Sequence, residues 1–303
     1  MTLKIGVLGF SEGNGHPLSF SAIVNGYDDE AFGRAGWPVI HAYLGRREAD
    51  EFGFPDTTVT HVWCPDRAQA AAIAAACRIA EVVDDPAEMI GAVDAVMILR
   101  DDAASHRPLA APFLAHGLPV FVDKPLCVTA EDLAFFRPHL ESGRLMSCSG
   151  LRHARELDEV RANLADFGTI SLVRASVVVD WARYGIHMLE AVMGALGRRP
   201  VAVQRHVARH ESVAVTLDDG TLLLIDALGA VPKTFGIDIF GARRIERVEI
   251  SDNFSAFRRT VARFIEQVRS GVPAIEPADT VRVIETLMAG AAAEPGGPRV
   301  PLP

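Results

Sequence analysis

The chain has 303 residues, of which 49% are hydrophobic and 23% charged, and its formal net charge is −9. This length and composition predict a globular protein of two domains of roughly 150 residues each. The acidic balance and the lack of a basic run exclude a phosphate-tracking surface, so we expect no nucleic-acid partner. No segment approaches the ~20 apolar residues of a membrane helix, and the first residues run into a short strand without a secretory signal, so we expect no membrane partner.

The four cysteines are Cys64, Cys77, Cys127 and Cys148. They lie far apart and show neither CxxC nor CxxH spacing, which argues against a structural zinc site and against a disulfide framework. We therefore expect no metal, and a reducing cytoplasm as the location.

The first half of the chain alternates short apolar runs with alanine-rich stretches, the pattern that builds a parallel sheet from βαβ units. The predicted strands are Leu3–Leu8, Val59–Trp63, Ala95–Leu99 and Pro119–Val122. A helix is predicted over Arg67–Ala80 and a turn and helix over Asp101–His116. These elements predict an α/β domain with a parallel sheet over residues 1–147.

About fifty residues separate the first two predicted strands, more than an ordinary crossover helix needs. We therefore predict an insertion over residues 12–57, approximately. Its polar and aromatic residues include Asn14, His16, Ser19, Ser21, Asn25, Tyr27, Trp37, His41 and Tyr43. They indicate either a surface subdomain with its own small core or a wall of the active site, and in the second case His16 is a candidate substrate-binding residue.

The second half, residues 148–303, has longer β-type runs joined by turn signals such as Asp218-Asp219-Gly220. The predicted strands are Ser171–Val179, Val201–Val207, Ser212–Leu217, Thr221–Asp226 and Thr234–Phe240. Helices are predicted over Phe254–Arg269 and Pro277–Ala292. A mostly antiparallel, open-sheet domain follows from this pattern.

A glycine-containing turn follows the first strand, where a nucleotide pyrophosphate could approach the backbone at a helix N-terminus. Its candidate cofactor-binding residues are Gly9, Ser11, Gly13, Asn14 and Gly15. The turn departs from GxGxxG, so a plain tight turn explains it about as well. Pro17 suits the first turn of a following helix.

The second strand is followed by Asp66 and Arg67. Asp66 could bind the ribose hydroxyls of NAD or cap the next helix, and the position slightly favours the cap. Arg67 could instead meet the 2′-phosphate of NADP, so the sequence leaves the cofactor as NAD or NADP.

With these pieces in order, the chain resembles the Gfo/Idh/MocA oxidoreductase family. The segments that carry the resemblance are Lys4–Gly15, Val93–Leu99 leading to His106, Phe121–Leu126, Tyr184–Glu190 and Phe264–Pro303. The most specific is Asp123-Lys124-Pro125, which matches the family's Glu-Lys-Pro signature with aspartate in place of glutamate. The resemblance implies a Rossmann-like dinucleotide-binding domain over residues 1–147, with His106, Asp123, Lys124 and Pro125 at the cofactor, and a substrate-binding and oligomerisation domain over residues 148–303.

The resemblance also implies catalytic roles. Lys124, at the end of a parallel strand, would orient a nicotinamide and a substrate hydroxyl. His187 would be the general base or acid and contact the substrate. Arg183 stands where the family usually has an aspartate, so Asp180 or Tyr184 could substitute for that group, and Arg183 could bind an anionic part of the substrate.

We therefore expect an NAD(P)-dependent dehydrogenase or reductase acting on a small polyhydroxylated or carbonyl compound, and assembling as a homodimer or homotetramer. One alternative is a non-catalytic sensor or regulatory binding protein on the same fold. Another is a relative that uses bound NAD for elimination or hydrolysis.

Overall fold

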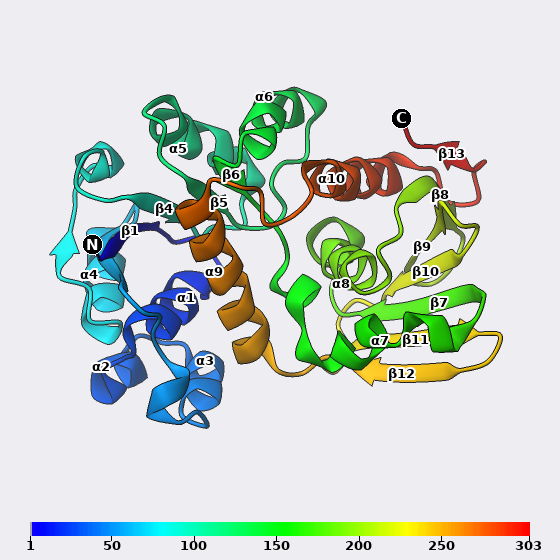
Figure 1. The fold of residues 1–303 in the computed structure, drawn as a ribbon, viewed down its shortest axis with the longest axis horizontal. Coiled ribbons are helices and arrows are strands. Elements are labelled where there is room, and N and C mark those ends of the chain that lie inside the picture. Colours follow the sequence, from blue (N-terminus) through cyan, green and yellow to red (C-terminus); the bar gives the residue numbers. More distant parts are fainter. Residues whose placement is uncertain (1) are drawn as a thin grey trace. The chain divides into compact units, whose positions relative to one another are not determined.

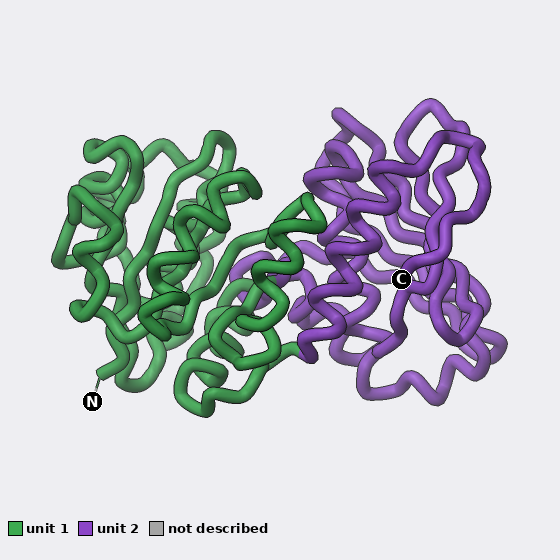
Figure 2. The backbone as a smooth tube through the Cα atoms, turned by 90° about the horizontal axis from the view of Figure 1, so that it is seen from above, with its two compact units in different colours: residues 1–147, 257–275 green, residues 148–256, 276–303 purple. Residues whose placement is uncertain are grey.

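The computed structural model describes residues 2–303. The chain divides into two compact units: residues 1–147 with 257–275, and residues 148–256 with 276–303 (Figure 2). The segment 257–275 thus belongs to the first unit, although we expected all of residues 148–303 to form the second domain. Among the described residues, no helix is both long enough and apolar enough to cross a membrane.

The first unit is built on a parallel sheet of strand order β3-β2-β1-β4-β5-β6 (Figure 1). The strands are β1 (Leu3–Leu8), β2 (Thr57–Trp63), β3 (Glu81–Val82), β4 (Ala95–Ile98), β5 (Val120–Val122) and β6 (Leu145–Met146). Every residue of β4 and β5 is buried, as is typical of strands that helices cover on both faces. The predicted parallel α/β sheet is confirmed.

Helices connect these strands and cover the sheet. They are α1 (His16–Asn25), α2 (Asp29–Arg34), α3 (Pro38–Leu44), α4 (Arg67–Ala76), α5 (Ala103–Ala115) and α6 (Ala130–Glu141), with the 3₁₀ turns η1 (Ala49–Glu51) and η2 (Pro86–Met89). The helix predicted to reach Ala80 ends at Ala76. The reason is that Arg78 adopts a left-handed φ of 54°, which lets the Ile79 amide donate to the Ala74 carbonyl and closes the helix.

The predicted insertion is smaller than expected. Eight of the ten residues of α1 are buried, so α1 is the ordinary crossover helix, and the added elements are α2, α3 and η1. These have an aromatic core of their own, because Tyr27 packs against Phe32, His41 and Phe52. The hydroxyl groups of Tyr43 and Ser19 form a hydrogen bond that joins α3 to α1. Burial raises the pKa of the Tyr43 hydroxyl.

The second unit has a sheet of strand order β12-β11-β7-β10-β9-β8-β13. Its strands are β7 (Ile170–Val177), β8 (Pro200–His206), β9 (Glu211–Leu217), β10 (Leu222–Ala227), β11 (Phe235–Gly241), β12 (Ile245–Glu249) and β13 (Val300–Pro301). All pairs are antiparallel except β7 with β10. The predicted mostly antiparallel sheet is therefore confirmed, with β12 and β13 in addition.

The remaining helical elements follow β6 in the sequence. They are η3 (Gly150–His153), η4 (Arg155–Leu157), α7 (Asp158–Ala162), η5 (Leu164–Phe167), the π-helical turn η6 (Trp181–Gly185), α8 (Ile186–Leu196), α9 (Asn253–Ser270) and α10 (Pro277–Ala292). Alternate residues of β10 are buried, so one face of the sheet forms the core of the unit. The indole of Trp181, which is 1% exposed, donates to the Leu287 carbonyl and so fastens η6 to α10.

Most of α9 returns to the first unit, where Gln267 makes the key polar contacts. Its side-chain amide donates to the carbonyl oxygens of Gly143 and Leu145 at 3.0 Å each, and its oxygen accepts from the Ala274 amide at 2.9 Å. Gln267 is 1% exposed, so water cannot replace these bonds.

We expect Gln267→Met to lower the free energy of unfolding by about 3 kcal/mol, because it leaves buried backbone groups without partners. The measurement is urea denaturation followed by circular dichroism. Glu266→Gln, a change at an exposed side chain on the same helix, is the matched control and should leave the transition in place. Equal midpoints for Gln267→Met and the native chain would contradict this account.

Candidate active site

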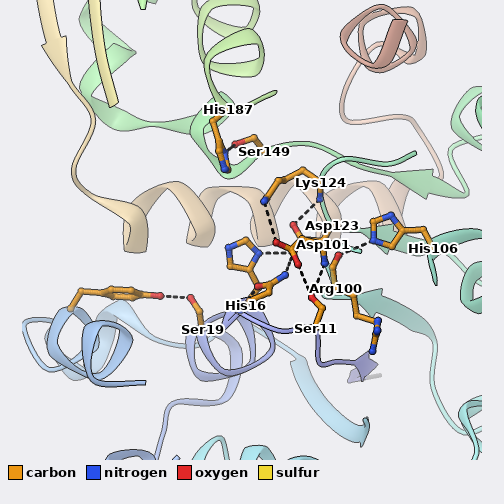
Figure 3. A network of polar contacts seen from close by, with 12 residues as sticks. Ser11, His16, Ser19, Arg100, Asp101, His106, Asp123, Lys124, Ser149 and His187 are labelled. Atoms are coloured by element: carbon orange, nitrogen blue, oxygen red, sulfur yellow. Dashed lines mark hydrogen bonds and ion pairs between the residues drawn. The ribbon is translucent and has the colours of Figure 1, made fainter. Parts of the chain in front are cut away.

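Three loops meet at the carboxyl edge of the parallel sheet. They follow β1, β4 and β5, whose last residues Leu8, Ile98 and Val122 are aligned in register. The strand order changes direction between β1 and β4, and ligands of open α/β sheets bind at such switch points. Figure 3 shows the polar side chains that these loops bring together.

Asp123 is the buried centre of this cluster. Its carboxylate accepts from His16 Nδ1 at 2.6 Å, from Asn14 Nδ2 at 2.9 Å and from the Lys124 amide at 2.8 Å. Burial alone would raise the pKa of Asp123, but the charge and hydrogen bond of His16, the charge of Lys124 and the Asn14 hydrogen bond lower it to about 2. Asp123 is therefore ionised at neutral pH.

Lys124 is positioned by the neighbouring loops. Its side chain is 7% exposed and its Nζ lies 3.7 Å from Oδ2 of Asp101. The other oxygen of Asp101 accepts from the Ser11 hydroxyl at 2.6 Å, and the Asp101 amide donates back to Ser11 Oγ at 3.1 Å. The predicted cofactor residues Ser11 and Lys124 thus belong to one network, through an aspartate that our sequence reasoning did not single out.

His106 does not face a cofactor, contrary to expectation. It is fully buried in α5, with Nδ1 at 3.0 Å from the Leu126 carbonyl oxygen and Nε2 at 2.8 Å from the Arg100 carbonyl oxygen. It therefore holds the β4 and β5 loops together. Arg100 adds a further tie, because its guanidinium donates to the Phe10 carbonyl at 2.6 Å.

The three glycines of the turn after β1 have different surroundings. Gly13 is exposed, has a φ of 79°, and no heavy atom lies within 4 Å of the position of a Cβ. At Gly9 a Cβ would lie 2.7 Å from Pro17, and at Gly15 it would lie 2.6 Å from Trp37. Glycine is thus required for close packing at Gly9 and Gly15, while the backbone at Gly13 stays open to a ligand.

The Asn14 side chain also shapes this turn, since its oxygen accepts from the His16 amide at 2.8 Å. The turn is joined to the inserted elements by an edge-to-face contact between Phe10 and Trp37. The insertion therefore has a small core of its own and also packs on the glycine turn. That it forms a wall of the active site stays a prediction.

After β2, Asp66 caps α4 by accepting from the Ala68 amide at 2.8 Å. Arg67 forms an exposed ion pair with Asp84. The second oxygen of Asp66 makes no hydrogen bond within residues 2–303 and remains available to a ribose, so this end of the sheet also fits a dinucleotide.

In the second unit, Ser149 Oγ lies 2.6 Å from His187 Nδ1 and accepts from the Leu151 amide at 3.2 Å. The ring of Tyr184 packs edge-to-face on His187, with centroids 5.1 Å apart. Asp180, a predicted substitute for the missing aspartate, instead caps η6 by accepting from the Arg183 amide at 2.8 Å. The Arg183 side chain is exposed.

Ser149 is a second residue that sequence reasoning missed, because no motif or spacing links it to a histidine 38 positions away. Asp101 had a weak signal, since it follows the end of a predicted strand. Among residues 2–303, no group of three or more His, Cys, Asp or Glu side chains is arranged to hold a metal ion.

The fold and the loops at its switch point define the first unit as a Rossmann domain. A family model described as an oxidoreductase family with an NAD-binding Rossmann fold, the Gfo/Idh/MocA model, matches residues 33–136. The predicted family and the predicted class of nicotinamide cofactor agree with this match. A search of curated proteins found no significant match.

Solved structures share the fold at low sequence identity. A myo-inositol dehydrogenase from Lactobacillus casei, solved with NAD(H) and myo-inositol, has a TM-score of 0.77 and 15% identity, covering 100% of this chain and 97% of that one. A scyllo-inositol dehydrogenase from the same organism, with NAD(H) and scyllo-inositol, has a TM-score of 0.76 and 14% identity, covering 99% of each chain. A myo-inositol 2-dehydrogenase from Lactobacillus plantarum has a TM-score of 0.75 and 13% identity, covering 100% of each.

The depressed pKa of Asp123 predicts a pH dependence of stability. The folded-state pKa of about 2 lies below the ordinary value of 3.8, so the ionised carboxylate stabilises the fold above pH 4, and this stabilisation is lost as the pH falls toward 2. The stabilisation by the ionised carboxylate amounts to about 2 kcal/mol. We expect the unfolding free energy of Asp123→Asn to fall less steeply than that of the native chain over this range. The measurement is urea denaturation of both proteins at pH 4, 3 and 2. If the free energy of unfolding fell equally with pH in both, Asp123 would have an ordinary pKa.

Proposed function

We propose that the protein is an NAD-dependent oxidoreductase that moves a hydride between its cofactor and a small polyhydroxylated or carbonyl compound. The observation that carries this proposal is Lys124, a buried amine at the carboxyl end of β5 and at the switch point of an NAD-binding Rossmann fold. Lys124 is not a solvated surface lysine, because its side chain is 7% exposed and its Nζ lies 3.7 Å from Asp101 of a neighbouring loop.

The lysine has two tasks in this proposal. Its ammonium group donates hydrogen bonds to the substrate oxygen and stabilises the negative charge that develops there when the hydroxyl proton leaves. Asp101 holds that ammonium group in place, and Ser11 in turn holds Asp101. The glycine turn and Asp66 would bind the dinucleotide, which supplies the hydride acceptor or donor when bound.

The second unit contributes substrate contacts in this proposal. His187, oriented by Ser149 and packed against Tyr184, offers a polar ring. Arg183 offers an exposed guanidinium for a negatively charged part of the substrate. The structural neighbours crystallised with myo-inositol and scyllo-inositol support a polyol as the substrate class. Homo-oligomerisation stays a prediction from the family resemblance.

The carboxylates that follow β2 and β3, Asp66 and Asp84, support NAD over NADP. Arg67, the one basic candidate for a 2′-phosphate that the sequence indicated, is paired with Asp84, and Asp66 adds a negative charge beside it. A 2′-phosphate would therefore meet repulsion at this position.

We expect NADH to bind at least about tenfold more tightly than NADPH, a difference of about 1.4 kcal/mol. Calorimetric titration of the purified chain, after any co-purified nucleotide has been removed, measures both. Asp84→Asn should reduce the difference in affinity between NADH and NADPH, because Arg67 would lose its ion pair and could then bind the 2′-phosphate. Equal or tighter binding of NADPH by the native chain would rule out the NAD preference.

We expect Lys124→Met to lower kcat by about 100-fold or more while NADH binding persists, because the charge that stabilises the reacting oxygen is lost. Turnover is followed by nicotinamide absorbance with myo-inositol, scyllo-inositol and related polyols. Lys4→Met, at an exposed position on β1, is the control. Full turnover by Lys124→Met would refute the role of Lys124, and a native chain inactive on every polyol would refute the substrate class.

A further inference from the structure

His16 is a histidine whose ring is held by a buried, ionised carboxylate. Its side chain is 20% exposed, whereas that of Asp123, 2.6 Å away, is 3% exposed. An ionised carboxylate can only accept a hydrogen bond, so His16 Nδ1 must carry a hydrogen. In the neutral ring the free electron pair is therefore on Nε2.

The ring is also fixed by packing. It lies 5.4 Å from the Phe20 ring and 5.0 Å from the Phe257 ring, measured between centroids. Nε2 has no hydrogen-bond partner within residues 2–303. The aromatic contacts and the Asp123 bond thus hold one unoccupied, lone-pair nitrogen in a defined direction.

The surroundings suit a reaction that moves a proton. The charged groups around the ring are Asp123, Lys124, which follows Asp123 in the same loop and lowers its pKa, and Asp101, which pairs with Lys124. Figure 3 shows these residues in one cluster at the sheet edge. His16 therefore belongs to the same loop cluster as the lysine that the proposed function places at the reacting oxygen.

For His187, the Ser149 hydroxyl can either donate to Nδ1 or accept from it, so this contact alone does not decide which ring nitrogen carries the hydrogen. A proton acceptor must present its lone pair to the substrate. The contact of His16 with Asp123 leaves the lone pair of its neutral ring on Nε2.

We propose that His16 accepts the proton of the substrate hydroxyl that is oxidised, with Asp123 and Asn14 as positioning residues. This inference rests on the proposed function. The O–H bond breaks and its proton binds Nε2, the carbon–oxygen double bond forms, and the hydride leaves carbon for the oxidised nicotinamide cofactor. The imidazolium then loses its proton to water, and Asp123 stabilises its positive charge in the meantime.

The first test reads the ring directly, without cofactor or substrate. Nitrogen NMR of the ¹⁵N-histidine-labelled full chain, with His16→Gln used to assign the signal, should show a His16 ring with hydrogen on Nδ1 and a bare Nε2 when neutral. Hydrogen on Nε2 of the neutral ring would overturn the inference. Asp123→Asn should remove the preference, because an amide can donate as well as accept.

The second test compares three variants in oxidation of the polyol that the native chain turns over. We expect His16→Gln to lower kcat/KM by about 100-fold or more and to lose the acidic limb of the pH profile, with NADH binding retained. The control His210→Gln removes a histidine that is paired with Asp226 in the second unit. This variant should leave kcat/KM and the acidic limb of the pH profile unchanged.

His187→Gln completes the comparison. Loss of the acidic limb in His187→Gln but not in His16→Gln would overturn the inference while leaving the proposed function intact. A native chain without turnover of any polyol would instead overturn the proposed function, and with it the catalytic role of His16.

Discussion

The negative charge of Asp123 organises this end of the molecule. A carboxylate that is 2% exposed is stable only when it is paired and hydrogen-bonded. The partners come from the loop after β1, through Asn14 and His16, and from its own loop, through the Lys124 amide. Asp123 follows β5, and its partners Asn14 and His16 lie at the start of α1. The need to pair this one buried charge therefore fixes the start of α1 against the end of β5.

A second set of contacts extends this arrangement to β4. Ser11 and Asp101 exchange hydrogen bonds, and Arg100 donates to the Phe10 carbonyl. Consequently the three loops at the switch point form one polar network, in which Lys124 joins the two sets of contacts through its amide and its ammonium group. The departures of the glycine turn from GxGxxG belong to this network, since Ser11 and Asn14 are two of its members.

Much of the fold could be predicted from the sequence, because buried parallel strands are uninterrupted apolar runs and the capping residue Asp66 precedes its helix. Lys124 and Asp123 were also predictable, since they lie in one short motif. The pairing of His16 with Asp123 was not, because 107 positions separate them and only the strand order brings their loops together. His106 was misassigned for a related reason: sequence shows that a histidine follows β4, but not that two backbone carbonyls enclose its ring.

The return of α9 to the first unit has a consequence for synthesis of the chain. The carbonyls of Gly143 and Leu145 have emerged from the ribosome long before Gln267, which must satisfy them, is translated. These carbonyl groups of the nascent parallel sheet therefore lack their Gln267 partner while strands β7 to β12 of the second unit are made. Completion of the first unit is therefore a late event in biogenesis, because it requires residues 257–275, which follow six of the seven strands of the second sheet.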